Sequence, residues 1–215
     1  ANGIALVWSD PWPGVVSGGA RYSMARPAKW PLTESLVAVD DLEFVMDSAD
    51  NAGLMALEAL RVEAHRPRIS NEVDERSLPH ELDWLSTAVH LSKGCYRGQE
   101  AVAKTHNLGH PPRRLVFLHL DGSGHLIPEP GAEIWVVNDD GTRSDRARGV
   151  VTSVAQHFEQ GPIALALLQR TVPELAELII VNDEREISAN QEVIVPSSAG
   201  KAAGLARPNL LMGKN

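Results

Sequence analysis

The residues with the clearest chemical potential lie in the octapeptide Lys93-Gly94-Cys95-Tyr96-Arg97-Gly98-Gln99-Glu100, which carries the only cysteine of this 215-residue chain. A lone cysteine cannot close a disulfide within the chain. Positive charges at Lys93 and Arg97, if near the thiol, favour the thiolate, the form that attacks electrophiles and binds metals. A buried, inert cysteine beside a turn is the alternative, but basic flanks and two glycines argue against an apolar pocket. We interpret Cys95 and Lys93 as a functional centre.

The octapeptide opens a basic stretch in an acidic chain. The whole chain has a net charge of −8, whereas residues 93–114 hold five cations against the single anion Glu100, a net charge of +4. Such a stretch suits a small anionic ligand, although a solvated face that balances acidic neighbours would show the same charges.

Composition narrows the function class. Hydrophobic residues make up 43% and charged residues 22%, as in ordinary globular proteins. The acidic balance argues against nucleic-acid binding, and no apolar run reaches the roughly 18 residues of a membrane span. One cysteine and no visible secretory signal indicate a cytoplasmic protein, and we expect a monomer.

The histidines and Cys95 allow two other kinds of site. His106 and His110 are four residues apart, but Gly109 and the prolines after it interrupt a helix, and no paired-cysteine pattern exists, so we expect no metal site. Cys95 with His90 or His106 would form a cysteine-nucleophile pair, as in a cysteine hydrolase, which we rank third because no orienting residue is identifiable.

The first half of the chain alternates strand and helix signals, which predicts an α+β fold. Expected strands cover 4–8, 15–24 and 34–39. An Asp40 or Asp41 cap predicts a helix that carries Leu42, Val45 and Met46, and Asp50 or Asn51 caps a second over 52–65, with Leu54, Leu57, Leu60 and Ala64 on one face. A helix or loop follows at 82–91, and a helix over 99–104.

The second half changes character after the prolines of residues 110–114, which end the preceding helix. Short strand-like segments follow at 115–120, 133–137, 149–154, 163–168, 178–181 and 192–195, with turn signals at Asp140-Gly141 and Asn182-Asp183. This pattern predicts a small β-barrel or sandwich. We expect an α/β portion at 1–110, a barrel at 111–197 and a loose tail at 198–215.

The octapeptide resembles the signature of the YgfZ family of folate-binding proteins, relatives of the glycine cleavage T-protein, an aminomethyltransferase. Further segments are similar to this superfamily in the same order, over about residues 30–197: Leu60-Arg61-Val62-Glu63-Ala64, Pro79-His80-Glu81, Gly149–Ser153 and Ile163–Ala166. Leu57 and Glu58 stand where T-proteins carry Arg-Asp, and His65 stands where they carry glycine. These departures favour the YgfZ branch.

The resemblance implies parts of ferredoxin-like α/β domains followed by a small C-terminal β-barrel, around a channel for tetrahydrofolate. Because the strand at 4–8 begins almost without lead-in, we expect the N-terminal domain to be truncated. The resemblance further implies an accessory role in making or maintaining iron–sulfur proteins, with client or assembly proteins as partners. The alternative is aminomethyl transfer to tetrahydrofolate, so whether the protein is an enzyme stays open.

The chemical groups of tetrahydrofolate indicate which kinds of residue would bind it. Its pterin ring offers hydrogen-bond donors to a carboxylate, and its glutamate tail prefers arginine or lysine. The expected cofactor-binding residues are Tyr96, Arg97, Gln99, Glu100, Arg61, Glu63 and Glu81, with Arg114 a further cation. Arg61 and Glu63 could equally be a solvated helix face, Glu81 a structural cap, and Tyr96 a packed ring.

Cys95 has several possible reactions within this hypothesis. Its thiolate could react with a folate-bound one-carbon unit, join a partner thiol, or contact an iron–sulfur species transiently. A stable cluster held by this chain alone is unfavourable because clusters need about four ligands. Ligation shared with a partner or a second copy stays open.

Overall fold

A computed structural model describes residues 4–10, 14–23, 30–182 and 185–200. The second half forms a closed barrel of six antiparallel strands: β3 (Arg113–Leu120), β4 (Glu133–Val136), β5 (Gly149–His157), β6 (Gly161–Gln169), β7 (Leu178–Asn182) and β8 (Arg185–Val193). The order around the barrel is β3-β6-β5-β4-β7-β8, so β3 closes it against β8. The expected β-barrel is confirmed.

The sequence of β3 shows why an apolar run forms this barrel. Val116 and Leu118 point into the barrel core, and Leu115 and Phe117 alternate with them into a second core outside it. A strand buried on both faces needs continuous rather than alternating hydrophobicity. This second core forms where the first half of the chain packs on the outer face of the barrel.

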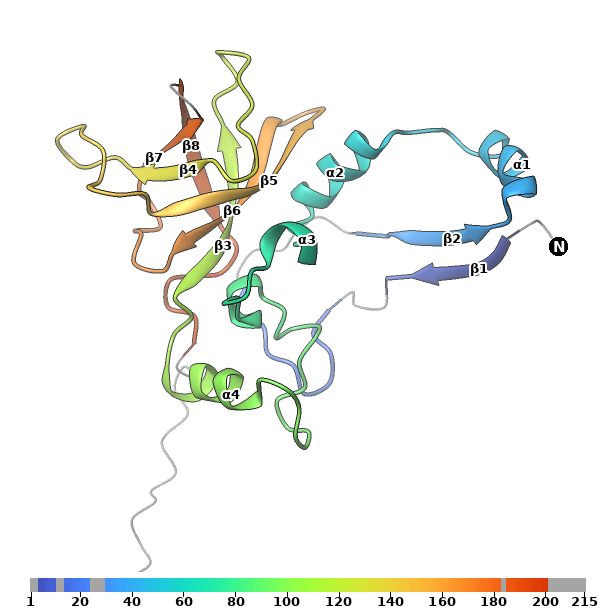
Figure 1. The fold of residues 1–215 in the computed structure, drawn as a ribbon, viewed down its shortest axis with the longest axis horizontal. Helices are drawn as coiled ribbons and strands as arrows, with labels where there is room; N and C mark the ends of the chain where they lie inside the picture. Colours follow the sequence, from blue (N-terminus) through green and yellow to red (C-terminus); the bar gives the residue numbers. More distant parts are fainter. Residues whose placement is uncertain (1–3, 11–13, 24–29, 183–184, 201–215) are drawn as a thin grey trace, which may run out of the picture.

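The first half holds a two-stranded sheet and several short helices (Figure 1). β1 (Ile4–Ser9) pairs antiparallel with β2 (Thr33–Val37), and this hairpin projects away from the barrel together with α1 (Leu42–Asp47). The remaining elements lead back to the barrel: η1 (Val39–Asp41), α2 (Leu54–Glu63), α3 (Ile69–Glu72), η2 (Pro79–Leu82) and α4 (Gln99–Leu108). The α/β character is thus confirmed, whereas a ferredoxin-like domain is not established by these elements.

α2 forms where expected but buries a different face, and of the residues expected on the buried face only Ala64 is buried. Ala59 and Val62 pack against the barrel, while Leu54 is 80% exposed and Leu60 is 45% exposed. A small side chain such as Ala59 lets the helix backbone come close to β5, so the sheet selects this face over the leucine stripe. The N-cap is Gly53, and neither Asp50 nor Asn51 caps the helix.

Two expected strands differ from the structure. Within 15–23 the chain turns at Ser17-Gly18, where Gly18 has a φ of +73° and a side chain would collide with the His90 ring. The last barrel strand is residues 185–193 rather than 192–195, because pairing with β3 and β7 fixes its register. Residue 24, Asp183 and residues 201–215 of the expected tail lie outside the described residues.

Candidate functional site

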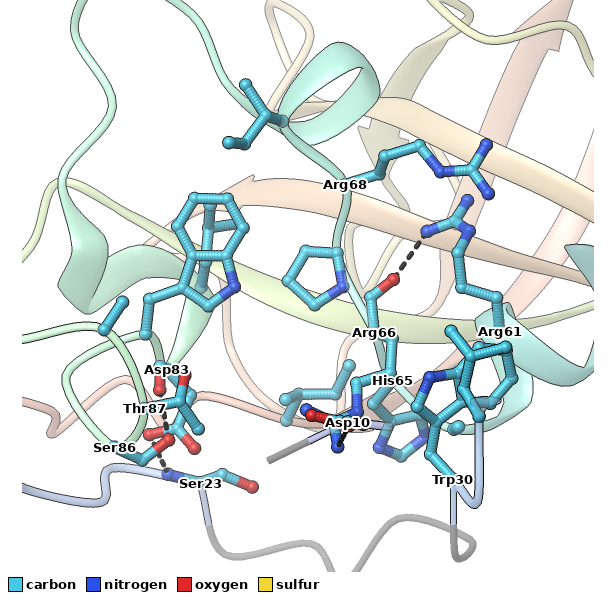
Figure 2. A pocket seen from close by; sticks show the side chains of 18 of the residues that line it. Asp10, Ser23, Trp30, Arg61, His65, Arg66, Arg68, Asp83, Ser86 and Thr87 are labelled. Atoms are coloured by element: carbon cyan, nitrogen blue, oxygen red, sulfur yellow. Dashed lines mark hydrogen bonds and ion pairs between the residues drawn. The ribbon is translucent and has the colours of Figure 1, made fainter. Parts of the chain in front are cut away.

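A cavity of about 1030 Å³ is lined almost entirely by the first half of the chain, and Ile194 is its one described lining residue from the second half (Figure 2). It is walled by the β1–β2 hairpin, the end of α2, the segment after it, the turn after η2, and Ile194 beyond β8. Its main polar and aromatic wall residues are Trp8, Asp10, Arg21, Ser23, Trp30, Thr33, Glu34, Arg61, His65, Arg66, Arg68, Ser70, Asp83, Trp84, Ser86 and Thr87. The three indoles provide broad flat surfaces that suit a planar ligand.

Arg61 is the most heavily bonded cation of this wall. Its side chain is nearly buried and donates to Glu58 Oε2 from Nη2 at 2.8 Å and to Ser153 Oγ from Nη2 at 2.7 Å. Its Nη1 donates to the Arg66 backbone carbonyl at 2.6 Å. Arg61 therefore acts as a strut between α2, the barrel and the segment that follows α2.

Glu72 completes this ionic cluster from α3. Its buried carboxylate accepts from the Ser153 hydroxyl at 2.5 Å and from the Arg68 backbone amide at 2.6 Å. Burial alone would raise the pKa of Glu58, but the hydrogen bonds and charges of Arg61 and Arg68 hold this pKa below its usual range. The cluster fixes the position of residues 65–68 on the cavity wall.

Asp83 supplies a carboxylate on the opposite side of the cavity (Figure 2). It ends η2 in the left-handed conformation, with a φ of 56°. Its Oδ1 accepts the backbone N–H groups of Tyr22 at 2.7 Å and Ser23 at 3.1 Å. Burial raises the pKa of Asp83, and these two amides and the charge of Arg21 oppose that rise.

His65 lies in the tight turn that follows α2. Its φ of 54° is the left-handed conformation, which explains why a glycine would suit this position. Its ring packs on Phe117 with centroids 5.1 Å apart, and burial lowers the pKa of the imidazole. Its Nδ1 is buried without a hydrogen-bond partner among the described residues, so a ligand could satisfy it.

The octapeptide lies outside the cavity wall. Lys93, Cys95 and Arg97 are exposed on the loop before α4, and Lys93 Nζ lies 5.8 Å from the centre of the half-buried Tyr96 ring. Exposure excludes the buried, inert alternative for Cys95. Gln99 and Glu100 form the first turn of α4 and are likewise absent from the wall.

The octapeptide glycines have different roles. Gly98 has a φ of +81° at the N-cap of α4, so it makes the turn into the helix possible. A Cβ on Gly94 would meet no atom within 4 Å and its backbone is ordinary. Only Gly98 therefore marks a required backbone path.

The structure places the other predicted residues in structural contacts. Glu63 lies next to buried His157, with Oε2 3.4 Å from Nε2, and accepts from Gln160 at 3.1 Å. Glu81 is fully buried and accepts a hydrogen bond from Arg113 Nη2 at 2.9 Å, and Arg113 also forms an ion pair with Asp74. Of the nine residues predicted for the site, only Arg61 lies on the cavity wall.

Sequence reasoning missed Asp83, Trp84, His65 and Arg68. Asp83 and Trp84 sit between the two motifs at Pro79 and Lys93, and an acidic residue beside a tryptophan was a usable signal. His65 stood out only as a departure from glycine.

Arg114, expected as a further cation for the ligand, is fully buried and donates to the Val172 carbonyl and to Gln191 within the barrel.

The histidines do not assemble a metal centre in the part of the chain that is described. No group of three or more His, Cys, Asp or Glu side chains there is arranged to hold an ion. His106 Nδ1 is instead 2.7 Å from the Tyr22 hydroxyl, and burial raises the pKa of Tyr22 to about 12. Within the same described ranges, no helix has the length and apolar character to cross a bilayer.

Comparison with known proteins shows a likeness to solved structures. No protein-family model matches the chain, and no curated protein does. Among solved structures the chain is similar to the glycine cleavage system aminomethyltransferase T from Bartonella henselae, with a TM-score of 0.55 and 23% sequence identity. The match covers 74% of this chain and 43% of that protein, so the chain spans less than half of its length. The fold of this chain is accordingly that of an aminomethyltransferase T-like protein.

Proposed function

We propose that this protein binds tetrahydrofolate in the cavity that the first half of its chain lines. The observation that carries the proposal is the cavity itself, with Trp8, Trp30 and Trp84 on its wall. Its volume of about 1030 Å³ lies just above the usual range for small-molecule sites, which is about 300–1,000 Å³. The shared fold with aminomethyltransferase T supports a folate-related role.

The residues present fit this cofactor. Indoles can stack on the flat face of the pterin ring. A carboxylate such as Asp83 can accept hydrogen bonds from the N–H groups at the edge of that ring. The buried His65 Nδ1 offers a further polar contact. Bound tetrahydrofolate would supply nitrogen atoms that carry a one-carbon unit, while the chain's own residues bind it, orient it and exclude water.

Calorimetric titration with tetrahydrofolate tests this proposal. We expect saturable heat and quenching of indole fluorescence on binding. Trp84→Leu should weaken binding severalfold, because stacking on an aromatic ring is lost. Absence of both heat and quenching with the folded protein would refute folate binding.

We further propose an accessory role in iron–sulfur protein assembly or maintenance, in which Cys95 contacts a partner or a cluster species. Its exposure on a loop supports contact with another molecule, and the neighbouring Lys93 and Arg97 suit an anionic one. A strain lacking the protein should recover iron–sulfur enzyme activity with the wild type but not with Cys95→Ala. Full recovery with a stably folded Cys95→Ala would remove Cys95 from the function.

Aminomethyl transfer is the second candidate, favoured by the structural match to aminomethyltransferase T. It predicts turnover of an aminomethyl-lipoyl carrier in the presence of tetrahydrofolate. Measuring ammonia release and methylenetetrahydrofolate formation distinguishes it from the accessory role, which requires no turnover of that carrier.

A further inference from the structure

The cavity wall has opposite chemistry at its two sides. Figure 2 shows Asp83, Ser86, Thr87 and Ser23 grouped at one side and Arg61 and Arg68 at the other. One side therefore offers hydrogen-bond acceptors around a carboxylate, and the other offers guanidinium groups. A ligand that fills the cavity would meet both.

Asp83 is held ready as an acceptor. Two backbone amides fix Oδ1, and the Ser86 hydroxyl donates to the Asp83 carbonyl at 2.6 Å. Both amide bonds fall on Oδ1, and the Ser86 side chain also hydrogen-bonds to the carboxylate, which lowers the pKa of Asp83 against the effect of burial. A left-handed backbone at a non-glycine residue is a strained arrangement of the kind that clusters at binding sites. Arg21 on the same wall favours the ionised carboxylate through its charge.

The arginines on the other side are not equivalent. Arg61 donates to Glu58, Ser153 and the Arg66 carbonyl, and its Nη1 lies 3.7 Å from Glu72 Oε2. Arg66 is paired with Asp10 at 2.7 Å. The Arg68 side chain is 43% exposed and contacts Glu58 through Nη2 alone, as far as the described residues show, which leaves Nε and Nη1 for a ligand.

We propose that the cavity binds its ligand in one orientation, with the N–H edge of a planar heterocycle on Asp83 and the anionic end on Arg68. The inference rests on the proposed folate binding and adds to it the residues that bind the two ends of the ligand, Asp83 for the heterocycle and Arg68 for the anionic tail. Arg61 is a positioning residue for this site: it holds the segment that carries Arg68, and its guanidinium is bonded to Glu58, Ser153 and Arg66 and ion-paired with Glu72.

Two probes separate the ends. Tetrahydrofolate carries both the heterocycle and the anionic tail, and 6-methyltetrahydropterin carries the heterocycle alone. Asp83→Asn should weaken both probes by about tenfold, because a charge-assisted acceptor is lost. Arg68→Gln should weaken tetrahydrofolate by about fivefold and leave 6-methyltetrahydropterin unchanged.

Matched controls are Asp139→Asn and Arg76→Gln, which remove the same charges from exposed positions away from the wall. Asparagine tolerates a left-handed backbone and can still accept the two amides through its carbonyl oxygen, so Asp83→Asn should fold, as circular dichroism can verify. If the wild type binds tetrahydrofolate but Arg68→Gln weakens both probes equally, or Asp83→Asn spares the pterin, the orientation is wrong. If the wild type does not bind tetrahydrofolate, the proposed function itself fails.

Discussion

Arg61 Nη1 donates to the backbone carbonyl of Arg66 over 2.6 Å, which ties the end of α2 to the segment beyond its terminal turn. The same guanidinium binds Glu58 on its own helix and Ser153 on β5. Three parts of the chain are thus joined through one buried cation. Substituting Arg61 therefore tests whether its hydrogen bonds and ion pairs support the cavity wall.

Replacing Arg61 by methionine should lower the free energy of unfolding by about 3–5 kcal/mol, because Glu72 would be left as a buried carboxylate without its cation. Urea unfolding followed by circular dichroism measures the change. Arg76→Met, at an exposed position, should change stability by less than about 0.5 kcal/mol. A loss below about 1 kcal/mol for Arg61→Met would show that the cluster does not support the fold.

Arg113 allows a comparison of two carboxylates on one guanidinium. Glu81 is fully buried, whereas the Asp74 side chain is 52% exposed. Glu81→Gln should cost about 2–3 kcal/mol, since a buried charge-assisted bond is lost, and Asp74→Asn at most about 1 kcal/mol, since water screens that pair. Equal losses in denaturant unfolding would mean that burial does not decide the strength of these two pairs.

The barrel was predictable because its signals are local. Short, mainly apolar runs such as 115–120 and 163–168 lie between turn residues, and every residue of these two runs except His119 is buried. The length of β8 was not predictable, since its outer residues are polar and only pairing with neighbouring strands extends it back to Arg185.

The cavity was largely hidden from sequence reasoning because distant segments build it. Trp8, His65 and Asp83 come from three separate parts of the chain, and nothing in the spacing brings them together. A motif predicted Arg61 as a binding residue, but its hydrogen bonds within the protein give it a structural role. A short motif identifies residue types well, but it does not show which donors the fold has already used.

Gly94 and Gly98 provide a matched pair within the octapeptide. An added Cβ would meet no atom within 4 Å at either position, but only Gly98 has a left-handed backbone, with a φ of +81°. Gly98→Ala should therefore cost about 1–2 kcal/mol in unfolding free energy, and Gly94→Ala should be neutral or slightly stabilising. Similar effects of the two substitutions would contradict the conformation of Gly98.

The pH dependence of stability should reveal the fully buried His80. Burial first, and the charge of nearby His106 second, lower the pKa of His80 to about 4 from an ordinary value of 6.5, against a backbone contact at Val102 that raises it. The unfolded chain therefore takes up this proton first as the pH falls. The stabilisation is complete above pH 6.5 and is lost between pH 6.5 and about 4, by about 3 kcal/mol in total.

Urea unfolding at several pH values between 7 and 4 measures this loss, and His80→Leu isolates the contribution of one imidazole. The wild type should lose more stability than His80→Leu over this range, by about 3 kcal/mol, because leucine has no proton to gain. Burial lowers the pKa of His65 and of His106 as well, so both proteins keep some dependence of the same sign. His125→Asn, at an exposed left-handed position, should follow the wild-type curve. Parallel curves for the wild type and His80→Leu would show that His80 is protonated as readily in the folded protein as in the unfolded chain.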